Sequence, residues 1–113
     1  MEIRPFEGPL GAEVEGLDAS RPQAPETFRR LREALDAHLV LRLRDQTLDD
    51  PALIAFSQGF GELDPPGPNP YGAPFLPEYP EINVISNVVE NGRPIGNLGA
   101  GEAVWHADMT YVD

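Results

Sequence analysis

Cysteine and lysine are both absent from this 113-residue sequence. Without cysteine the chain can form no disulfide, no thiolate metal site and no cysteine nucleophile. Its eight arginines face 19 aspartates and glutamates, which gives a formal net charge of −11. Such a charge repels the phosphate backbone of a nucleic acid and an anionic membrane surface. We therefore expect neither a nucleic acid nor a membrane as a partner.

Long apolar runs are missing as well. No stretch approaches the roughly 20 residues that a membrane-spanning helix needs. Residues 1–9 show no basic start followed by an apolar run, so no signal peptide is predicted. A chain of this length has room for about one domain. We expect a cytoplasmic protein with a single domain.

The first 44 residues predict short strands, a helix and a further strand. Residues 3–17 alternate loosely between apolar and polar side chains and contain three glycines, a pattern typical of short strands joined by turns. Residues 26–38 carry large apolar side chains at spacings of three and four, which predicts a helix with one buried stripe. Residues 39–44 place leucine at every second position from Leu39, which predicts a strand with its leucines on one face.

A second helix is predicted after Thr47. This threonine offers a capping hydroxyl, and Asp50 follows three residues later, as in a capping box. Pro51 then falls in the first helical turn, where proline is tolerated. Gly59 and Gly61 are expected to end the helix.

Residues 64–80 are rich in proline, which removes backbone donors and fixes φ, so we expect no regular structure there. The stretch is expected to be either a long ordered loop, anchored by Tyr71, Phe75 and Tyr79, or a mobile lid. The same three rings could instead form a substrate cage.

Residues 81–89 are the most strand-like stretch of the sequence, because they are rich in β-branched side chains. The Asn91-Gly92 pair that follows predicts a hairpin turn. A glycine-rich passage over residues 92–102 leads to a further strand that begins near residue 103. The order of helices and strands shows no regular βαβ alternation, which favours the α+β class.

His106 and Asp108 are the candidate metal ligands. On an extended strand, residues two apart lie on one face with Cα atoms roughly 6–7 Å apart. One histidine and one carboxylate are two of the three ligands that hold non-heme Fe(II) in a facial triad. In so acidic a chain this spacing also arises by chance, as a surface pair or a loop hydrogen bond. Trp105 favours the metal site, because we expect it to provide an apolar wall there. His38, the other histidine, is predicted to lie at a helix C-terminus.

The residues around this pair carry a family resemblance. The run from Glu90 to Gly99, ENGRPIGNLG, is followed by WHADMTY at residues 105–111. Residues 31–46 and the FGEL sequence at residues 60–63 agree in order and spacing. On these motifs the sequence resembles the N-terminal half of the taurine dioxygenase (TauD/TfdA) family, from about residue 10 to the last residue.

The resemblance implies an Fe(II)- and α-ketoglutarate-dependent dioxygenase, an oxidoreductase that hydroxylates a small organic substrate. It implies that His106 and Asp108 are the first two iron ligands. It also implies that residues 1–113 are a single, incomplete domain, part of a double-stranded β-helix (jelly roll) with two N-terminal helices. The family's distal histidine and its arginine for the co-substrate come from strands beyond this chain's last residue, and Arg93 matches neither. Asp64 stands where many members carry a substrate-contacting histidine, so the substrate class is not transferred.

From these missing groups we expect the isolated chain to bind Fe(II) weakly and to turn over little. Its activity would require a complementing C-terminal half or association with a second copy of the chain. The main alternative is a catalytically inactive binding or oligomerisation module derived from the same fold. A third interpretation is a small acidic scaffold whose likeness to the family is incidental.

Overall fold

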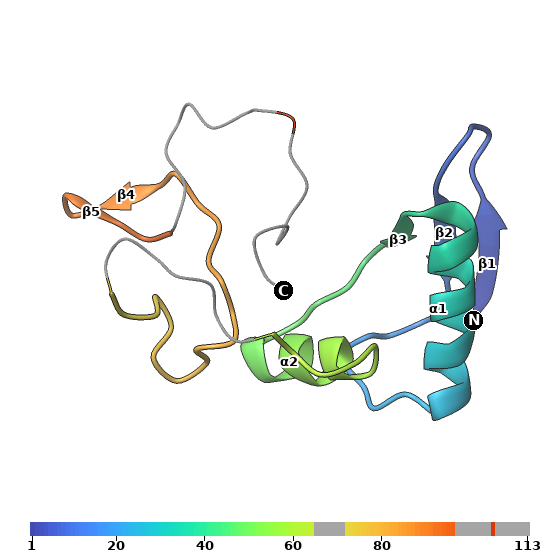
Figure 1. Cartoon of the computed structure of the whole chain (residues 1–113), viewed down its shortest axis with the longest axis horizontal. Helices are drawn as coiled ribbons and strands as arrows, with labels where there is room; N and C mark the ends of the chain where they lie inside the picture. Colours follow the sequence, from blue (N-terminus) through green and yellow to red (C-terminus); the bar gives the residue numbers. More distant parts are fainter. Residues whose placement is uncertain (65–71, 97–104, 106–113) are drawn as a thin grey trace. The chain divides into compact units, whose positions relative to one another are not determined.

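The computed structural model describes residues 1–64, 72–96 and 105 (Figure 1). The chain divides into two compact units, Met1–Pro65 and Pro66–Asp113. No helix within the described residues is long and apolar enough to cross a membrane. The two units are described in turn.

A three-stranded sheet forms the base of the first unit. Strand β1 (Glu2–Pro5) pairs antiparallel with β2 (Ala12–Glu15), and β2 pairs parallel with β3 (Leu41–Leu43), in the order β1-β2-β3. The short strands predicted near the N-terminus and after the first helix are therefore confirmed.

The strand predicted over residues 39–44 begins too early, because β3 starts at Leu41. Leu39 does not belong to the sheet: it is the C-cap of the preceding helix, with a left-handed φ of 67°, and its side chain is 68% exposed. Leu39 fits both the helical spacing of the apolar residues before it and the alternation of leucines after it. The sequence pattern alone therefore could not tell the end of the helix from the start of the strand.

Helix α1 (Pro25–His38) confirms the predicted amphipathic helix. Proline stands at its first position, where its missing N–H costs nothing, and Glu26 lies in the first turn, where the helix dipole favours a negative charge. Its buried residues are Phe28, Leu31 and Ala34, spaced by three. They turn one stripe of the helix toward the sheet, as the periodicity predicts.

The two faces of the sheet differ sharply in polarity. Ile3, Val14 and Leu43 lie side by side across the three strands and pack in the core with Phe28 and Leu31. The next row across the strands carries charges of alternating sign, because strand side chains alternate between faces. That row consists of Arg4, Glu13 and Arg42.

Glu13 joins this charged row through an ion pair with Arg42 and a second one with Arg44. The hydrogen bond from Arg42, helped by the positive charges of both arginines, holds the pKa of Glu13 below its ordinary value. The carboxylate therefore contributes stability at neutral pH that is lost as the pH falls through this lowered pKa.

Helix α2 (Asp50–Gln58) begins two residues later than the capping box predicted. The N-cap is Asp49, whose carboxylate accepts a hydrogen bond of 2.9 Å from the backbone N–H of Ala52. Thr47 has no role in the cap. The helix ends at Gln58, and Gly59 is its C-cap, in agreement with the predicted end.

Replacing Asp49 with alanine is expected to lower the free energy of unfolding by about 1 kcal/mol, because the first turn of α2 loses its side-chain acceptor. The Thr47→Ala variant is the matched control and should change it by less than about 0.3 kcal/mol. Urea denaturation followed by far-ultraviolet circular dichroism measures both. Equal losses in the two variants would contradict the assignment of the cap.

An aromatic cluster joins α1 to α2. The rings of Phe28, Phe56 and Phe60 contact one another with centroids 5.5–5.6 Å apart. Gly59 lies against the Phe28 ring so closely that a Cβ atom there would be 2.0 Å from it. Arg32 on α1 donates a hydrogen bond of 2.9 Å to the Gly59 carbonyl at the end of α2. These contacts fix the second helix on the first.

The second unit contains a hairpin in which β4 (Val89–Glu90) pairs antiparallel with β5 (Arg93–Pro94). Asn91 and Gly92 form its two-residue turn, both with positive φ (50° and 77°), as a type I′ turn requires. The turn prediction is confirmed.

The long strand predicted over residues 81–89 is wrong, because only its last residue belongs to a strand. Exposure does alternate along it: Ile82, Val84 and Ser86 are half-buried, whereas the residues between them are exposed. A strand also requires a ladder of hydrogen bonds to a neighbour, and the described part of this unit supplies that ladder only at the hairpin.

Candidate functional site

The predicted metal ligands, His106 and Asp108, lie outside the described residues, so the structure does not test their geometry. Trp105, directly before them, is described, and its side chain is fully exposed. The prediction that Trp105 provides an apolar wall at the metal site stays a prediction, because the residues on both sides of it lie outside the described ones. A tryptophan packs as a wall only where other apolar side chains meet it.

The hairpin of the second unit positions the start of the glycine-rich passage that leads to this motif. Ile95, just after β5, donates a backbone hydrogen bond of 3.1 Å to the Val88 carbonyl. Gly96 is buried against the extended backbone beside it, where a Cβ atom would lie 2.6 Å from the Ser86 nitrogen and 2.9 Å from the Val84 oxygen. A glycine at position 96 is thus required by close backbone approach.

The described residues offer no competing metal site. Within residues 1–64, 72–96 and 105, no group of three or more histidines and acids is placed to hold a metal ion. His38 is the last residue of α1, as predicted, and its carbonyl accepts a hydrogen bond of 2.7 Å from the Gly11 N–H. Arg93 lies on β5 opposite Glu90 and is exposed.

The aromatic residues of the proline-rich stretch are only partly described. Tyr71 lies outside the described residues. Phe75 and Tyr79 are half-buried, and the Tyr79 N–H donates a hydrogen bond of 3.0 Å to the Leu76 carbonyl. Their burial agrees with a role as loop anchors, and the substrate-cage alternative stays untested.

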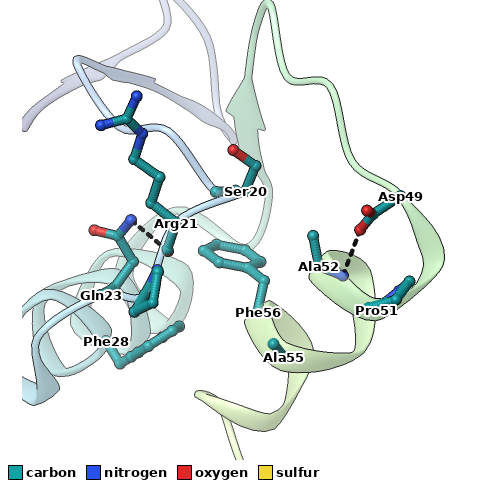
Figure 2. A pocket seen from close by; sticks show the side chains of 11 residues that line it. Ser20, Arg21, Gln23, Phe28, Asp49, Pro51, Ala52, Ala55 and Phe56 are labelled. Atoms are coloured by element: carbon teal, nitrogen blue, oxygen red, sulfur yellow. Dashed lines mark hydrogen bonds between the residues drawn. The ribbon is translucent and has the colours of Figure 1, made fainter.

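A pocket of about 480 Å³ opens in the first unit, between the connector that precedes α1 (residues 18–24) and the start of α2 (Figure 2). The rings of Phe28 and Phe56 line it. The remaining lining residues are Ala19, Ser20, Arg21, Pro22, Gln23, Asp49, Pro51, Ala52 and Ala55.

The polar groups at this pocket are engaged within the protein. Ser20 donates to Asp18 from both its hydroxyl (2.6 Å) and its backbone N–H (3.0 Å), and these bonds hold the pKa of Asp18 below its ordinary value. Gln23 donates to the carbonyls of Asp18 and Arg21, and Asp49 caps α2. The pocket therefore offers a mainly apolar surface, and these polar groups at its border bond within the protein.

The sequence analysis did not predict this pocket, because the connector that forms one side of it carries no motif or periodic pattern. The side chain of Gln46 holds that connector in place: it accepts from the Ala19 N–H at 2.7 Å and donates to the carbonyls of Leu17 at 2.9 Å and Arg44 at 2.7 Å. No local pattern in the sequence predicts the hydrogen bonds of Gln46 to Ala19 and Leu17, which lie 27 and 29 residues away.

Comparison with known families gives one match that covers nearly the whole chain. The family described as "Taurine catabolism dioxygenase TauD, TfdA family" matches residues 2–113. The matched range includes the Trp-His-x-Asp motif and both unit regions.

Individual relatives agree with this match. The chain is 37% identical to pentalenolactone F synthase of Streptomyces arenae, over 98% of this chain and 37% of that protein. It is 29% identical to an alpha-ketoglutarate-dependent sulfate ester dioxygenase of Pseudomonas putida, over 100% of this chain and 34% of that protein.

One solved structure, AAD-2 in complex with Mn(II) and N-oxalylglycine, resembles the chain with a TM-score of 0.53 and 32% identity. The likeness covers 56% of this chain and 23% of that one. N-oxalylglycine is an analogue of α-ketoglutarate. The chain spans about a third of the length of the curated relatives that it matches.

Proposed function

Because this chain belongs to the TauD/TfdA family of dioxygenases, we propose that it supplies the N-terminal part of an Fe(II)- and α-ketoglutarate-dependent dioxygenase. The single observation that carries the proposal is the family match over residues 2–113, which runs through the Trp-His-x-Asp motif. The alternative of an inactive module gains no support from the relatives, one of which is named as an α-ketoglutarate-dependent dioxygenase.

In this proposal His106 and Asp108 are two protein ligands of the iron. An imidazole nitrogen and a carboxylate oxygen are donors that suit Fe(II) and leave positions open for co-substrate and oxygen. Bound iron with α-ketoglutarate and O₂ would supply the oxidising power that hydroxylates a substrate C–H bond. The chain's own contribution in this proposal is to supply these two donors, two residues apart in the sequence.

The third ligand and the group that binds the far carboxylate of α-ketoglutarate have no candidate among the described residues. We propose that residues 1–113 form one incomplete jelly-roll domain, and that the part of the fold that this chain does not span supplies both groups. Association with a second copy of the chain is the other way to complete the site. The substrate is proposed to be a small organic molecule, and the differing names of the two relatives assign it no class.

Succinate formation from α-ketoglutarate tests the proposed function. We would join residues 1–113 to the part of the Streptomyces arenae synthase that follows its matched stretch, and call this the fused protein. With Fe(II) and O₂ the fused protein should form succinate, and the His106→Ala variant should lose at least about 99% of that rate, because an iron ligand is removed.

His38→Ala is the matched control, because His38 ends α1 and is no predicted ligand. It should keep more than about half of the rate, as expected for a substitution outside the site. The free 113-residue chain should form little succinate. A fused protein whose rate survives His106→Ala would contradict the proposed ligand, and a free chain with a rate that depends on His106 would contradict the need for a complementing part.

A further inference from the structure

We propose that Asn91, in the turn of the β4–β5 hairpin, is a site of spontaneous covalent modification, at which the side-chain amide is lost and an isoaspartate forms. The reaction needs neither iron nor a co-substrate, so the inference stands apart from the proposed function. It rests on the chemistry of the Asn91-Gly92 pair and on how weakly the hairpin restrains that pair.

The reaction is an attack of the Gly92 backbone nitrogen on the side-chain carbonyl carbon of Asn91. That nitrogen gives its proton to water and bonds to Cγ, while the Cγ–Nδ2 bond breaks and the amide nitrogen leaves as ammonia with a proton from water. The product is a succinimide ring. Water opens the ring at either carbonyl, which yields an aspartate or an isoaspartate whose backbone runs through Cβ and Cγ. No oxidant, reductant or cofactor takes part, and asparagine counts among the thermolabile residues.

The attacking nitrogen of Gly92 is open to its surroundings. A Cβ atom built on this glycine would meet nothing within 4 Å, so no neighbouring group crowds the nitrogen from that side. Among the described residues, no oxygen accepts a hydrogen bond from the Gly92 N–H. Asn91 and Gly92 are both exposed, so water reaches the reacting atoms. The hairpin therefore leaves both reaction partners accessible.

Two other exposed asparagines of the same unit, Asn83 and Asn87, lack these features. Each precedes a valine, whose branched side chain crowds the nitrogen that would have to attack. The Val88 N–H, which would attack Asn87, also donates a hydrogen bond of 3.1 Å to the Ser86 hydroxyl. Both asparagines therefore serve as internal references for Asn91.

The hairpin holds Asn91 only weakly. Ring closure requires rotation about the bond from the Asn91 Cα to its carbonyl carbon, and the closed turn hinders this rotation until the hairpin opens. Strands β4 and β5 have two residues each, and one of their two cross-strand pairs joins Val89 to Pro94. Pro94 has no N–H to donate, and both strands are exposed. A two-stranded hairpin this short opens readily.

An isoaspartate at position 91 disrupts the hairpin in which it forms. Its backbone is longer by one carbon atom, whereas the length of a two-residue turn sets the register of the strands that it joins. The hydrogen bond from Ile95 to the Val88 carbonyl depends on that register, as does the close approach of Gly96 to Ser86. The reaction also adds a carboxylate to a chain with a net charge of −11.

Mass spectrometry of peptides from the aged chain tests the reaction. The wild-type chain is incubated for days at physiological pH and temperature, both folded and in urea, and fragment spectra assign each conversion of amide to acid to one asparagine. Asn91 in the folded chain should react within about tenfold of its rate in urea, because the hairpin opens at little cost. Asn83 and Asn87 should react at least about tenfold more slowly than Asn91. A larger protection of Asn91 by the fold, or equal rates at the three asparagines, would overturn the proposal.

A methylation assay distinguishes isoaspartate from aspartate. A carboxyl methyltransferase specific for isoaspartate, supplied with isotope-labelled S-adenosylmethionine, should label the aged wild-type chain. Asn91→Gly is the matched variant, because Gly-Gly suits the same type I′ turn but has no side-chain carbonyl for the ring. After the same incubation it should take up at least about fivefold less label, since the other asparagines react slowly. A smaller difference would place the isoaspartate elsewhere and overturn the assignment to Asn91.

NMR tests the effect of the modification on the hairpin. Nuclear Overhauser contacts between Val89 and Pro94, which are cross-strand partners, should be present in the fresh chain and lost in the purified isoaspartyl form. Asn91→Asp is the control, because it adds the same charge with a normal backbone, and Asp-Gly also suits the turn. It should keep these contacts. Contacts that survive in the isoaspartyl form would contradict the predicted loss of register.

The outcomes separate this inference from the proposed function. A fused protein that forms succinate, together with a chain whose fold protects Asn91, would overturn this inference alone. Isoaspartate at Asn91 together with a fused protein that forms no succinate would overturn only the proposed function.

Discussion

Replacing Leu31 with alanine is expected to lower the free energy of unfolding by about 3 kcal/mol. Leu31 is the one large side chain with no exposed surface among the described residues, and it packs with Val14 and Phe28 between α1 and the sheet. Removing it takes away buried methyl groups and leaves a cavity that the surrounding residues fill only in part. Urea denaturation followed by far-ultraviolet circular dichroism measures the loss.

Leu35→Ala provides the matched control, because Leu35 lies one turn further along the same helix and is 39% exposed. The substitution leaves helix propensity nearly unchanged, so it should cost less than about 1 kcal/mol through the smaller loss of buried area. Similar losses at both positions would mean that α1 does not pack on the sheet through the stripe described here.

The helices show how far the sequence alone can lead. Helix α1 was predictable because one stripe of large apolar residues recurs at helical spacing and becomes the buried face. The start of α2 was harder, since Thr47 and Asp49 are both good caps. Pro51 decides between the two caps. A cap at Thr47 would require the Pro51 nitrogen to donate the first helical hydrogen bond, and proline has no N–H. With the cap at Asp49, that bond comes instead from Leu53, at 2.9 Å.

The prediction of a strand over residues 81–89 was wrong because a strand needs a neighbouring strand as well as suitable side chains. Its β-branched side chains suit a pleated surface, and the alternating exposure of Ile82 to Ser86 keeps that character. Hydrogen-bond partners, however, come from other segments, and no local pattern specifies them. The hairpin turn at Asn91-Gly92 was predictable because its positive φ angles are a local requirement.

The candidate site was likewise predictable only where a local motif marks its residues. His106 and Asp108 were identified from a motif within a family framework, and the comparisons confirm the family. The geometry of the two side chains stays a prediction, because both lie outside the described residues. The apolar pocket at Phe28 and Phe56 was not predictable, since it is built from a connector and a helix start that carry no chemical motif.

Loss of metal binding in His106→Ala is the other large effect that we expect. Two protein ligands leave a divalent ion mostly hydrated, so the free chain should bind Fe(II) weakly. The fused protein, with a third ligand, should bind it far more tightly, and α-ketoglutarate should strengthen the binding further by occupying open positions on the ion. Removing the His106 imidazole should weaken Fe(II) binding to the fused protein by at least about 100-fold, since even changes next to a ligand cost 10–100-fold.

Anaerobic calorimetric titration with Fe(II) is the measurement that tests the account most directly. It compares the fused protein with its His106→Ala and His38→Ala variants, each with and without α-ketoglutarate, and the free chain serves as a reference. Binding that strengthens with α-ketoglutarate, disappears in His106→Ala and persists in His38→Ala is the predicted result. Fe(II) binding that survives in His106→Ala, or that α-ketoglutarate leaves unchanged, would contradict the assignment of this chain to an iron-dependent oxygenase site.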